Sequence, residues 1–219
     1  MVGVSQKSEA TRDRLLHAAG AEFARVGFRS ASVREICDAA GANVSAVKYH
    51  FGSKEELYLA VWAVAAAEMV AEEPMPRVEG FAEPRDALRA FVAWFMRLVL
   101  TESETHPWTG ALLAHETVEP TPGALEMFVE HCAGPIKGEV SRIVRAIVGS
   151  RVRGKTFDDL VYGVVALCVT AKHSREILTR LGHAPPTSKA GINRMARVIA
   201  EFAISGLDGF AESNESEDG

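Results

Sequence analysis

The feature that most constrains this chain is a stretch from Ser32 to Lys54 that reads SVREICDAAGANVSAVKYHFGSK. Ser32 and Glu35 have the S-x-x-E spacing of a capping box, in which each side chain satisfies a free backbone N–H at a helix start. Gly41 predicts the end of that helix, because glycine enters the left-handed region with little strain. Asn43 is a favourable N-cap for a second short helix. The stretch therefore predicts a helix-turn-helix, whose second helix can enter a DNA major groove.

The side chains of the second predicted helix divide into an inner and an outer set. Val44 and Val47 are expected to point inward. The outer side chains are small where a base edge would approach, and cationic, phenolic or imidazole where phosphates would lie. Base contacts are also expected from the preceding helix, because the guanidinium of Arg34 matches the acceptor pair on guanine. The predicted DNA-contacting residues are Ser32, Arg34, Asn43, Val44, Ser45, Ala46, Lys48, Tyr49, His50 and Lys54.

The chain continues from this motif as VKYHFGSKEELYLAV, and the run resembles the TetR/AcrR transcriptional regulators over about residues 11–62. A later run, HPWTGALLAHETVEPTPGALEMF, resembles the C-terminal domain of the CecR (YbiH-like) branch of that family. The resemblance implies that Lys48, Tyr49 and Lys54 contact the DNA backbone, while His50 packs or makes a contact at the helix end. Many relatives carry tyrosine where this chain has Lys48, so a cation keeps the phosphate role and loses the aromatic packing.

Charge is distributed unevenly along the 219 residues, which carry a net charge of −5. Residues 1–54 hold eight Lys/Arg and five Asp/Glu, so a basic head precedes an acidic remainder. This pattern suits a modular DNA-binding protein and argues against an indiscriminate nucleic-acid binder.

The cysteines and the lengths of the apolar runs indicate the cellular compartment of the protein. Cys37, Cys132 and Cys168 are widely spaced in apolar helical patterns, which favours small buried hydrophobes over the alternative of a redox sensor. The first ten residues lack the apolar segment of a signal peptide, and no apolar run reaches the ~20 residues of a membrane span. The sequence therefore predicts a cytoplasmic protein.

Helical spacing of apolar residues persists through the rest of the chain without a convincing strand. We expect a helix break at Gly134-Pro135, and a helix capped by Thr156 with Asp159 that extends to about Leu181. The predicted fold class is all-α, with an N-terminal three-helix DNA-binding domain and a larger helical ligand-binding and dimerisation domain. The predicted domains are 1–54 for DNA binding, 55–210 for effector binding and dimerisation, and 211–219 as a disordered acidic tail.

Two motifs also have an enzymatic interpretation. Gly149–Thr156 satisfies the P-loop pattern, but that loop must follow a buried strand, and the preceding residues have helical spacing. A basic loop between helices is favoured. His115–Glu119 resembles a zinc-protease motif with Glu119 in place of the second histidine, so a cavity-lining or surface role for His115 and Glu116 is favoured over zinc. We therefore predict no enzyme, no cofactor and no metal.

The resemblance implies a one-component regulator, most often a repressor, that binds a palindromic operator as a homodimer and is released by a small apolar or aromatic effector. Its partners would be operator DNA, a second copy and the effector, with no membrane. The alternatives are a DNA-binding adaptor controlled by a protein partner, and a nucleotide- or zinc-dependent enzyme.

Two further sets of residues are assigned to the predicted effector-binding and dimerisation domain. The predicted effector-binding residues are Phe91, Trp94, Phe95, Trp108, His115, Glu116, Met127, Phe128 and His131. The predicted dimer-interface residues are Phe157, Val161, Val164, Leu167, Cys168, Met195, Ile199 and Phe202.

Overall fold

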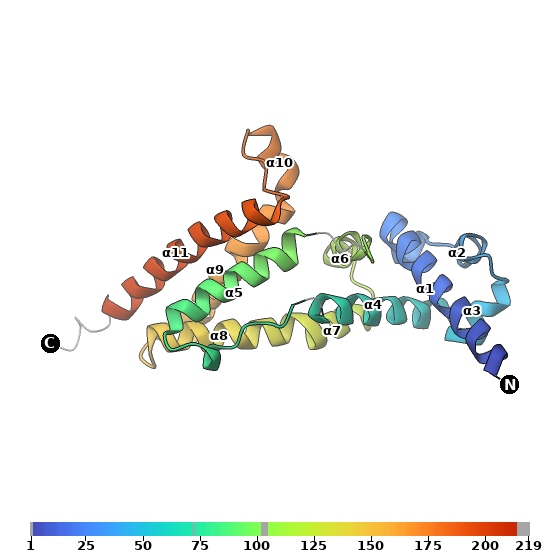
Figure 1. The fold of residues 1–219 in the computed structure, drawn as a ribbon, viewed down its shortest axis with the longest axis horizontal. Helices are drawn as coiled ribbons and strands as arrows, with labels where there is room; N and C mark the ends of the chain where they lie inside the picture. The colour runs from blue at the N-terminus through green and yellow to red at the C-terminus, as the bar shows by residue number, and fades with distance from the viewer. Residues whose placement is uncertain (1, 72, 102–104, 214–219) are drawn as a thin grey trace. The chain divides into compact units, whose positions relative to one another are not determined.

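The computed structural model describes residues 2–71, 73–101 and 105–213. No strand occurs among these residues, which confirms the all-α fold class (Figure 1). None of the helices in the described part combines the length and the hydropathy that a membrane span requires. The predicted disordered tail lies outside the described residues from position 214 onward, and residues 211–213 belong to the last helix.

The chain divides into two compact units that do not follow its linear order. The first unit joins Met1–Ala71 to Glu102–Ala133, and the second joins Glu72–Thr101 to Gly134–Gly219. The segment around Trp108 therefore packs with the N-terminal helices, although more than thirty residues separate it from Ala71 along the chain.

The first unit is organised around its two longest helices. Leu15, Ala19 and Phe23 recur at helical spacing on the first helix and are fully buried, and Gly27 (φ 77°) kinks that helix near its end. The second long helix contributes Leu57 and further apolar residues to the same core. The elements are α1 (Val2–Ser30), α2 (Val33–Ala40), α3 (Val44–Phe51), α4 (Lys54–Ala71), α6 (Thr109–Val118), α7 (Ala124–Phe128) and the π-helical η2 (Val129–Ala133).

The segment that begins α6 packs closely against α1 at a glycine of α1. A Cβ atom at Gly20 would lie 2.3 Å from the indole ring of Trp108, which is shorter than any normal contact between carbon atoms. The missing side chain at Gly20 is therefore what allows Trp108 to lie buried against α1. Seven residues further along α1, a Cβ at Gly27 would meet the ring of His115 at 3.2 Å.

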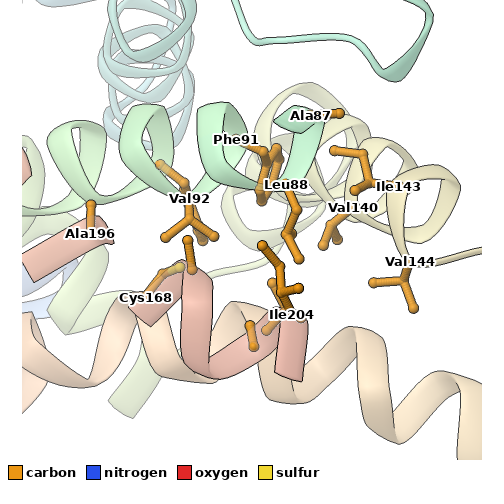
Figure 2. Packing of buried hydrophobic residues seen from close by; sticks show 14 of the residues in the cluster. Ala87, Leu88, Phe91, Val92, Val140, Ile143, Val144, Cys168, Ala196 and Ile204 are labelled. Atoms are coloured by element: carbon orange, nitrogen blue, oxygen red, sulfur yellow. The ribbon is translucent and has the colours of Figure 1, made fainter. Parts of the chain in front are cut away.

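The second unit is built around α5, which packs against α8, α9 and α11. Pro84 begins α5, as the sequence predicts, because a residue at the first helical position needs no backbone N–H. In Figure 2 the side chains of Leu88, Phe91 and Val92 point from α5 into a core shared with the neighbouring helices. The elements are η1 (Val78–Gly80), α5 (Pro84–Leu100), α8 (Gly134–Val148), α9 (Gly154–His173), α10 (Arg175–Arg180) and α11 (Lys189–Ser213).

Three local predictions in the C-terminal half are wrong. Gly134-Pro135 does not break the helix, because the π-helical turn of η2 accommodates the proline and leads directly into α8. Thr156 does not cap α9, which already begins at Gly154. The helix predicted to run to Leu181 ends at His173, and a separate short helix, α10, follows.

Glycine substitutions test the packing of α6 on α1. We expect Gly20→Ala to destabilise the protein by about 1–3 kcal/mol, because the added carbon displaces the Trp108 ring from a filled core. The matched control is Gly138→Ala in α8, where a Cβ meets no atom within 4 Å, so it should stabilise by about 0.5–1 kcal/mol. Urea unfolding followed by tryptophan fluorescence measures both changes. Equal effects of the two substitutions would contradict this packing.

Candidate nucleic-acid interface

The predicted helix-turn-helix is present in the first unit. Helix α2 ends at Gly41, whose backbone is left-handed (φ 60°, ψ 41°) and whose N–H closes the helix on Asp38. Asn43 caps α3, since its Oδ1 accepts the backbone N–H of Ser45 at 3.0 Å. Ile36 of α2 and Val47 of α3 lie in the core of the unit. The inner faces of both helices are thus fixed and their outer faces are left to solvent.

The start of α2 differs from the predicted capping box. Ser32 occupies the N-cap position, but its side chain makes no capping hydrogen bond. The carboxylate of Glu35 lies 3.8 Å from the guanidinium of Arg25 on α1, and Arg25 donates two shorter hydrogen bonds to Glu22. Arg34 is exposed beside Glu35. The predicted capping hydrogen bond of Ser32 is therefore absent.

Helix α3 carries six of the ten predicted DNA-contacting residues, and four of the six are exposed. Ser45, Lys48 and Tyr49 are exposed, and the Tyr49 side chain is 80% accessible. Val44, which we expected to point inward, is half exposed on the outer face of this helix. Ala46 is instead partly buried and packs against the core, so its side chain is turned away from the other predicted base contacts.

His50 and Lys54, two further residues of the predicted DNA-contacting set, contact neighbouring aromatic rings. His50 is partly buried, and its ring lies edge-on to Tyr49 with 4.9 Å between centroids. The ammonium of Lys54 donates to the carbonyl of Arg29 at 3.2 Å and lies 4.7 Å above the ring of Phe28. Lys54 therefore has a defined position at the start of α4, which a flexible surface lysine would lack.

Two arginines of α1 support this surface and were not assigned from the sequence. The guanidinium of Arg12 lies 5.3 Å above the ring of Phe51, the last residue of α3. Arg14 donates to the carbonyl of Ala40 at 3.0 Å and so ties α1 to the end of α2. The basic composition of the N-terminal segment was the available signal, but helical spacing alone could not show which cation meets α3.

The predicted polar pair His115 and Glu116 lies on α6 of the same unit. Glu116 is 1% exposed, and its carboxylate accepts the Tyr58 hydroxyl at 2.5 Å and the backbone N–H of Thr121 at 2.8 Å. His115 Nε2 lies 3.1 Å from the carbonyl of Ala24. Both residues therefore have protein partners, and among the described residues no group of histidines, cysteines and carboxylates has the arrangement of a metal site.

Tyr58 and Glu116 join α4 to α6 in a buried site. Burial, followed by the hydrogen bond to Glu116, raises the pKa of the Tyr58 hydroxyl above its ordinary value. The neutral phenol is thus held as a donor to the carboxylate. Trp62 Nε1 and Trp108 Nε1 are buried in the same unit without a hydrogen-bond partner in the structure.

The predicted effector-binding residues fall into both units. Phe91, Trp94 and Phe95 are buried in the core of the second unit, where Trp94 Nε1 donates to the carbonyl of Glu73 at 2.8 Å. The rest of the set belongs to the first unit: Trp108 and Glu116 are buried, His115, Met127 and Phe128 are partly buried, and His131 is exposed.

Neither of two hollows in the structure is lined by the whole predicted effector-binding set. A small hollow of about 10 Å³ in the first unit is lined in part by His115 and Glu116, and it is scarcely large enough for one water molecule. A broad open depression of about 510 Å³ in the second unit is lined by Val78, Ser141, Arg142, Arg145, Ala146 and Phe157. None of the lining residues of this depression belongs to the predicted effector set.

The structure also corrects part of the predicted dimer surface. Val161, Val164 and Cys168 face the core of the second unit, so they are not available to a second copy. Burial raises the pKa of the Cys168 thiol to about 12. Phe157, Leu167, Met195 and Ile199 are partly buried against the same core, and Phe202 is 69% exposed.

The P-loop-like segment lies between two helices. Gly149 (φ 73°) and Gly154 (φ 57°) turn the chain from α8 into α9, with no strand before the loop. Arg145 of α8 donates to the carbonyls of Gly149 and Val152 and lies 3.7 Å from the centre of the Phe157 ring. The segment is the basic interhelix loop that the helical spacing favours.

Family models match both parts of the chain. A model described as bacterial regulatory proteins of the tetR family matches residues 15–61. A second, described as the C-terminal domain of the HTH-type transcriptional dual regulator CecR, matches residues 84–207. Both resemblances found in the sequence are thereby confirmed.

Curated relatives and solved structures agree with these models. The dual regulator CecR of Shigella flexneri is 33% identical over 153 residues, which are 65% of this chain and 67% of that protein. The repressor NicS of Pseudomonas putida is 26% identical over 209 residues, or 93% and 95% of the two chains. The structure of the flavonoid-responsive regulator FrrA has the same fold, with a TM-score of 0.60 and 18% identity over 90% of this chain and 96% of that one.

Alkaline unfolding tests the Tyr58–Glu116 site. Because the pKa of Tyr58 is raised in the folded state, its contribution is complete below the unfolded value of about 10 and is lost as the pH rises further. We expect wild type to lose more stability than Tyr58→Phe between about pH 8 and about pH 11 in urea unfolding. Tyr49→Phe, at a tyrosine that is 80% exposed, is the control and should follow wild type. Parallel curves for Tyr58→Phe and wild type would contradict the assignment.

Proposed function

Because this chain belongs to the tetR family of bacterial regulatory proteins and carries the CecR C-terminal domain, we propose that it represses transcription by binding a palindromic operator as a homodimer. The family makes it a DNA-binding transcriptional regulator, not an enzyme. We further propose that residues 1–54 bind DNA, that residues 55–210 bind an effector and dimerise, and that the effector releases the operator.

The observation that carries the DNA-binding proposal is the outer face of α3. It presents a hydroxyl, an ammonium and a phenol from Ser45, Lys48 and Tyr49, while the opposite face is anchored by Val47. In our proposal α3 enters the major groove, Ser45 and Val44 lie at base edges, and Lys48 and Tyr49 reach phosphates. Lys54 and Arg12 flank the helix and add two further positive charges.

Removing the ammonium of Lys48 tests the docking. Each phosphate contact adds about 0.9 to the slope of log affinity against log salt, so Lys48→Ala should lower that slope by about one per half-site. Operator affinity should fall at the same time. Lys137→Ala removes the same charge from α8 and should leave the slope unchanged. Fluorescence anisotropy across a salt series measures both, and an unchanged slope for Lys48→Ala would contradict the model.

The proposed dimer face lies on the outer sides of α9 and α11. Tyr162 on α9 is 72% exposed, while Val198 and Phe202 on α11 are 67% and 69% exposed. Val198 and Phe202 are four residues apart, so they lie on one side of α11. Such exposed apolar side chains on two adjacent helices favour a protein partner, and the family supports a second copy.

A charge at Phe202 tests that face. We expect Phe202→Glu to convert the dimer to monomers and to abolish operator binding, because each half-site contact is too weak alone. Val118→Glu places the same charge at an apolar side chain that is 86% exposed in the first unit, and this control should remain dimeric. Sedimentation equilibrium gives the oligomeric state. A wild-type protein that is monomeric and still protects a palindrome would refute the proposal.

The effector proposal rests on the aromatic row of α5. The ring of Phe91 lies 5.8 Å from those of both Trp94 and Phe95, and one structural relative is named for its response to flavonoids. A ligand among these rings releases DNA only if it binds the DNA-free conformation more tightly. A tenfold loss of operator affinity needs about 1.4 kcal/mol of such coupling.

A regulator controlled by a protein partner is the second candidate. It is favoured by the close packing of the α5 aromatic side chains and by the open form of the depression in their unit. An aromatic ligand screen separates the two candidates. We expect a compound that quenches tryptophan fluorescence and weakens operator binding, with less effect on Trp94→Ala than on Trp108→Ala. If no compound releases the operator, the protein-partner candidate is preferred.

A further inference from the structure

The broad depression of about 510 Å³ in the second unit lies against one side of α8. Its lining includes Ser141, Arg142, Arg145 and Ala146, whose spacing places them together on that side of the helix. Serine and alanine are small, so they leave room between the two longer arginine side chains. The opposite side of α8 is packed in the core of the unit. The sizes of the residues on the outer side of α8 therefore produce the hollow.

The remaining lining residues, Val78 and Phe157, are held in place by charged neighbours. The N–H of Val78 donates to the completely buried carboxylate of Glu139 at 2.7 Å, and Arg142 donates to the same carboxylate. The guanidinium carbon of Arg145 lies 3.7 Å from the centre of the Phe157 ring, and its Nη1 donates to two carbonyls of the loop before α9. Both walls are thus fixed before a ligand arrives, which lowers the ordering cost of binding.

The region around the depression is basic, although most of the chain after the helix-turn-helix is acidic. Residues 140–157 contain five Lys or Arg and no Asp or Glu. Residues 55–219 as a whole carry a net charge of −8, because the full chain carries −5 and residues 1–54 carry +3. The cations of the region are Arg77, Arg142, Arg145, Arg151, Arg153 and Lys155, and its carboxylates are Glu79, Glu139, Asp158 and Asp159. Six positive groups against four negative ones leave the region with a net positive charge.

The combination of positive charge and apolar lining restricts what can bind there. Val78, Ala146 and Phe157 offer apolar surface that an inorganic anion cannot cover, and a neutral apolar molecule leaves the guanidiniums without a counter-charge. The acidic segment 211–219 supplies carboxylates but no large apolar side chain. A volume of about 510 Å³ is within the range of roughly 300–1,000 Å³ that is usual for small-molecule sites. A small organic anion meets both requirements.

We propose that this depression binds a small organic anion, in which a carboxylate or phosphate group is attached to an aromatic or aliphatic body. The anionic group binds Arg142 and Arg145, because a guanidinium can donate to two oxygens of such a group at once. The apolar body packs against Phe157, Val78 and Ala146 and leaves water there. The site shares no residue with the aromatic row of α5 or with the proposed DNA-binding face, so it stands independently of the function proposed above.

The first test is binding of 8-anilinonaphthalene-1-sulfonate, an aromatic anion whose fluorescence rises when its rings leave water. We expect full-length protein to bind it with a Kd of about 10–100 µM, because an open site leaves one side of the ligand in water. Arg142→Gln should weaken binding at least fivefold, and Ala146→Phe at least tenfold, because the added ring occupies the hollow. The controls Lys137→Gln, on the same helix, and Ala190→Phe, at an exposed alanine of α11, should bind like wild type.

The Ala146→Phe variant decides the first test if Arg142→Gln does not fold, because Arg142 also contacts buried Glu139, whereas Ala146 is exposed. Circular dichroism establishes that each variant is folded. Wild-type affinity in a folded Ala146→Phe variant would overturn the site.

The second test identifies the chemical group that the site recognises, by displacement of the bound fluorophore from wild type. 2-Naphthoate and 2-naphthyl phosphate have both charge and rings, whereas 2-naphthamide has the rings without the charge. We expect each anion to displace the fluorophore at concentrations at least fivefold lower than the amide, and the tighter of the two identifies the acidic group. Inorganic phosphate and a synthetic peptide of residues 211–219 should act at least tenfold more weakly than the tighter anion. Equal displacement by the amide, by inorganic phosphate or by the peptide would overturn the proposal.

Discussion

The burial of α2 and α3 against α1 and α4 is the interaction on which the proposed DNA-binding surface depends. Each of the two short helices has eight residues, too few to be stable in water alone. Their inward side chains, Ile36 and Val47, find a core only because α1 and α4 supply one. That core fixes the outer face of α3, so Lys48 and Tyr49 project from a rigid scaffold.

The same core reaches further along the chain than the helix-turn-helix. Helix α6 joins it through Trp108, which fits against Gly20, and through Glu116, which accepts the Tyr58 hydroxyl. A buried carboxylate is costly unless hydrogen bonds satisfy it, so the position of α6 is specified by more than apolar contact. Because α6 packs against α1, a displacement of α6 would act directly on a helix that supports the proposed DNA-binding face.

The second unit combines a filled core with apolar side chains that are exposed on its surface. Its core is filled by α5, α8, α9 and α11, and Glu139, which is completely buried there, accepts the backbone N–H of Val78 at 2.7 Å and fixes the short η1 helix. Apolar side chains that do not fit this core are concentrated on α9, α10 and α11. Exposed apolar surface of this kind marks protein–protein interaction sites, which supports the proposed dimer.

The sequence by itself determined the local structure that backbone chemistry dictates. Gly41 and Asn43 set the turn of the helix-turn-helix, Pro84 began α5, and helical spacing excluded a strand before the P-loop-like segment. Each of these signals acts within a few residues, so the sequence displays it directly. The family resemblance then extended these elements to a DNA-binding regulator.

Only the tertiary structure decided which side chains meet. The capping hydrogen bond predicted at Ser32 is absent, and the predicted effector residues are divided between two units. Val161, Val164 and Cys168 are buried in the core instead of lying on a dimer surface. Helical periodicity shows which apolar residues share one face of a helix, but α9 and α11 have apolar residues on more than one face. Which face turns inward depends on neighbours that are distant in the sequence, and that choice is made by packing.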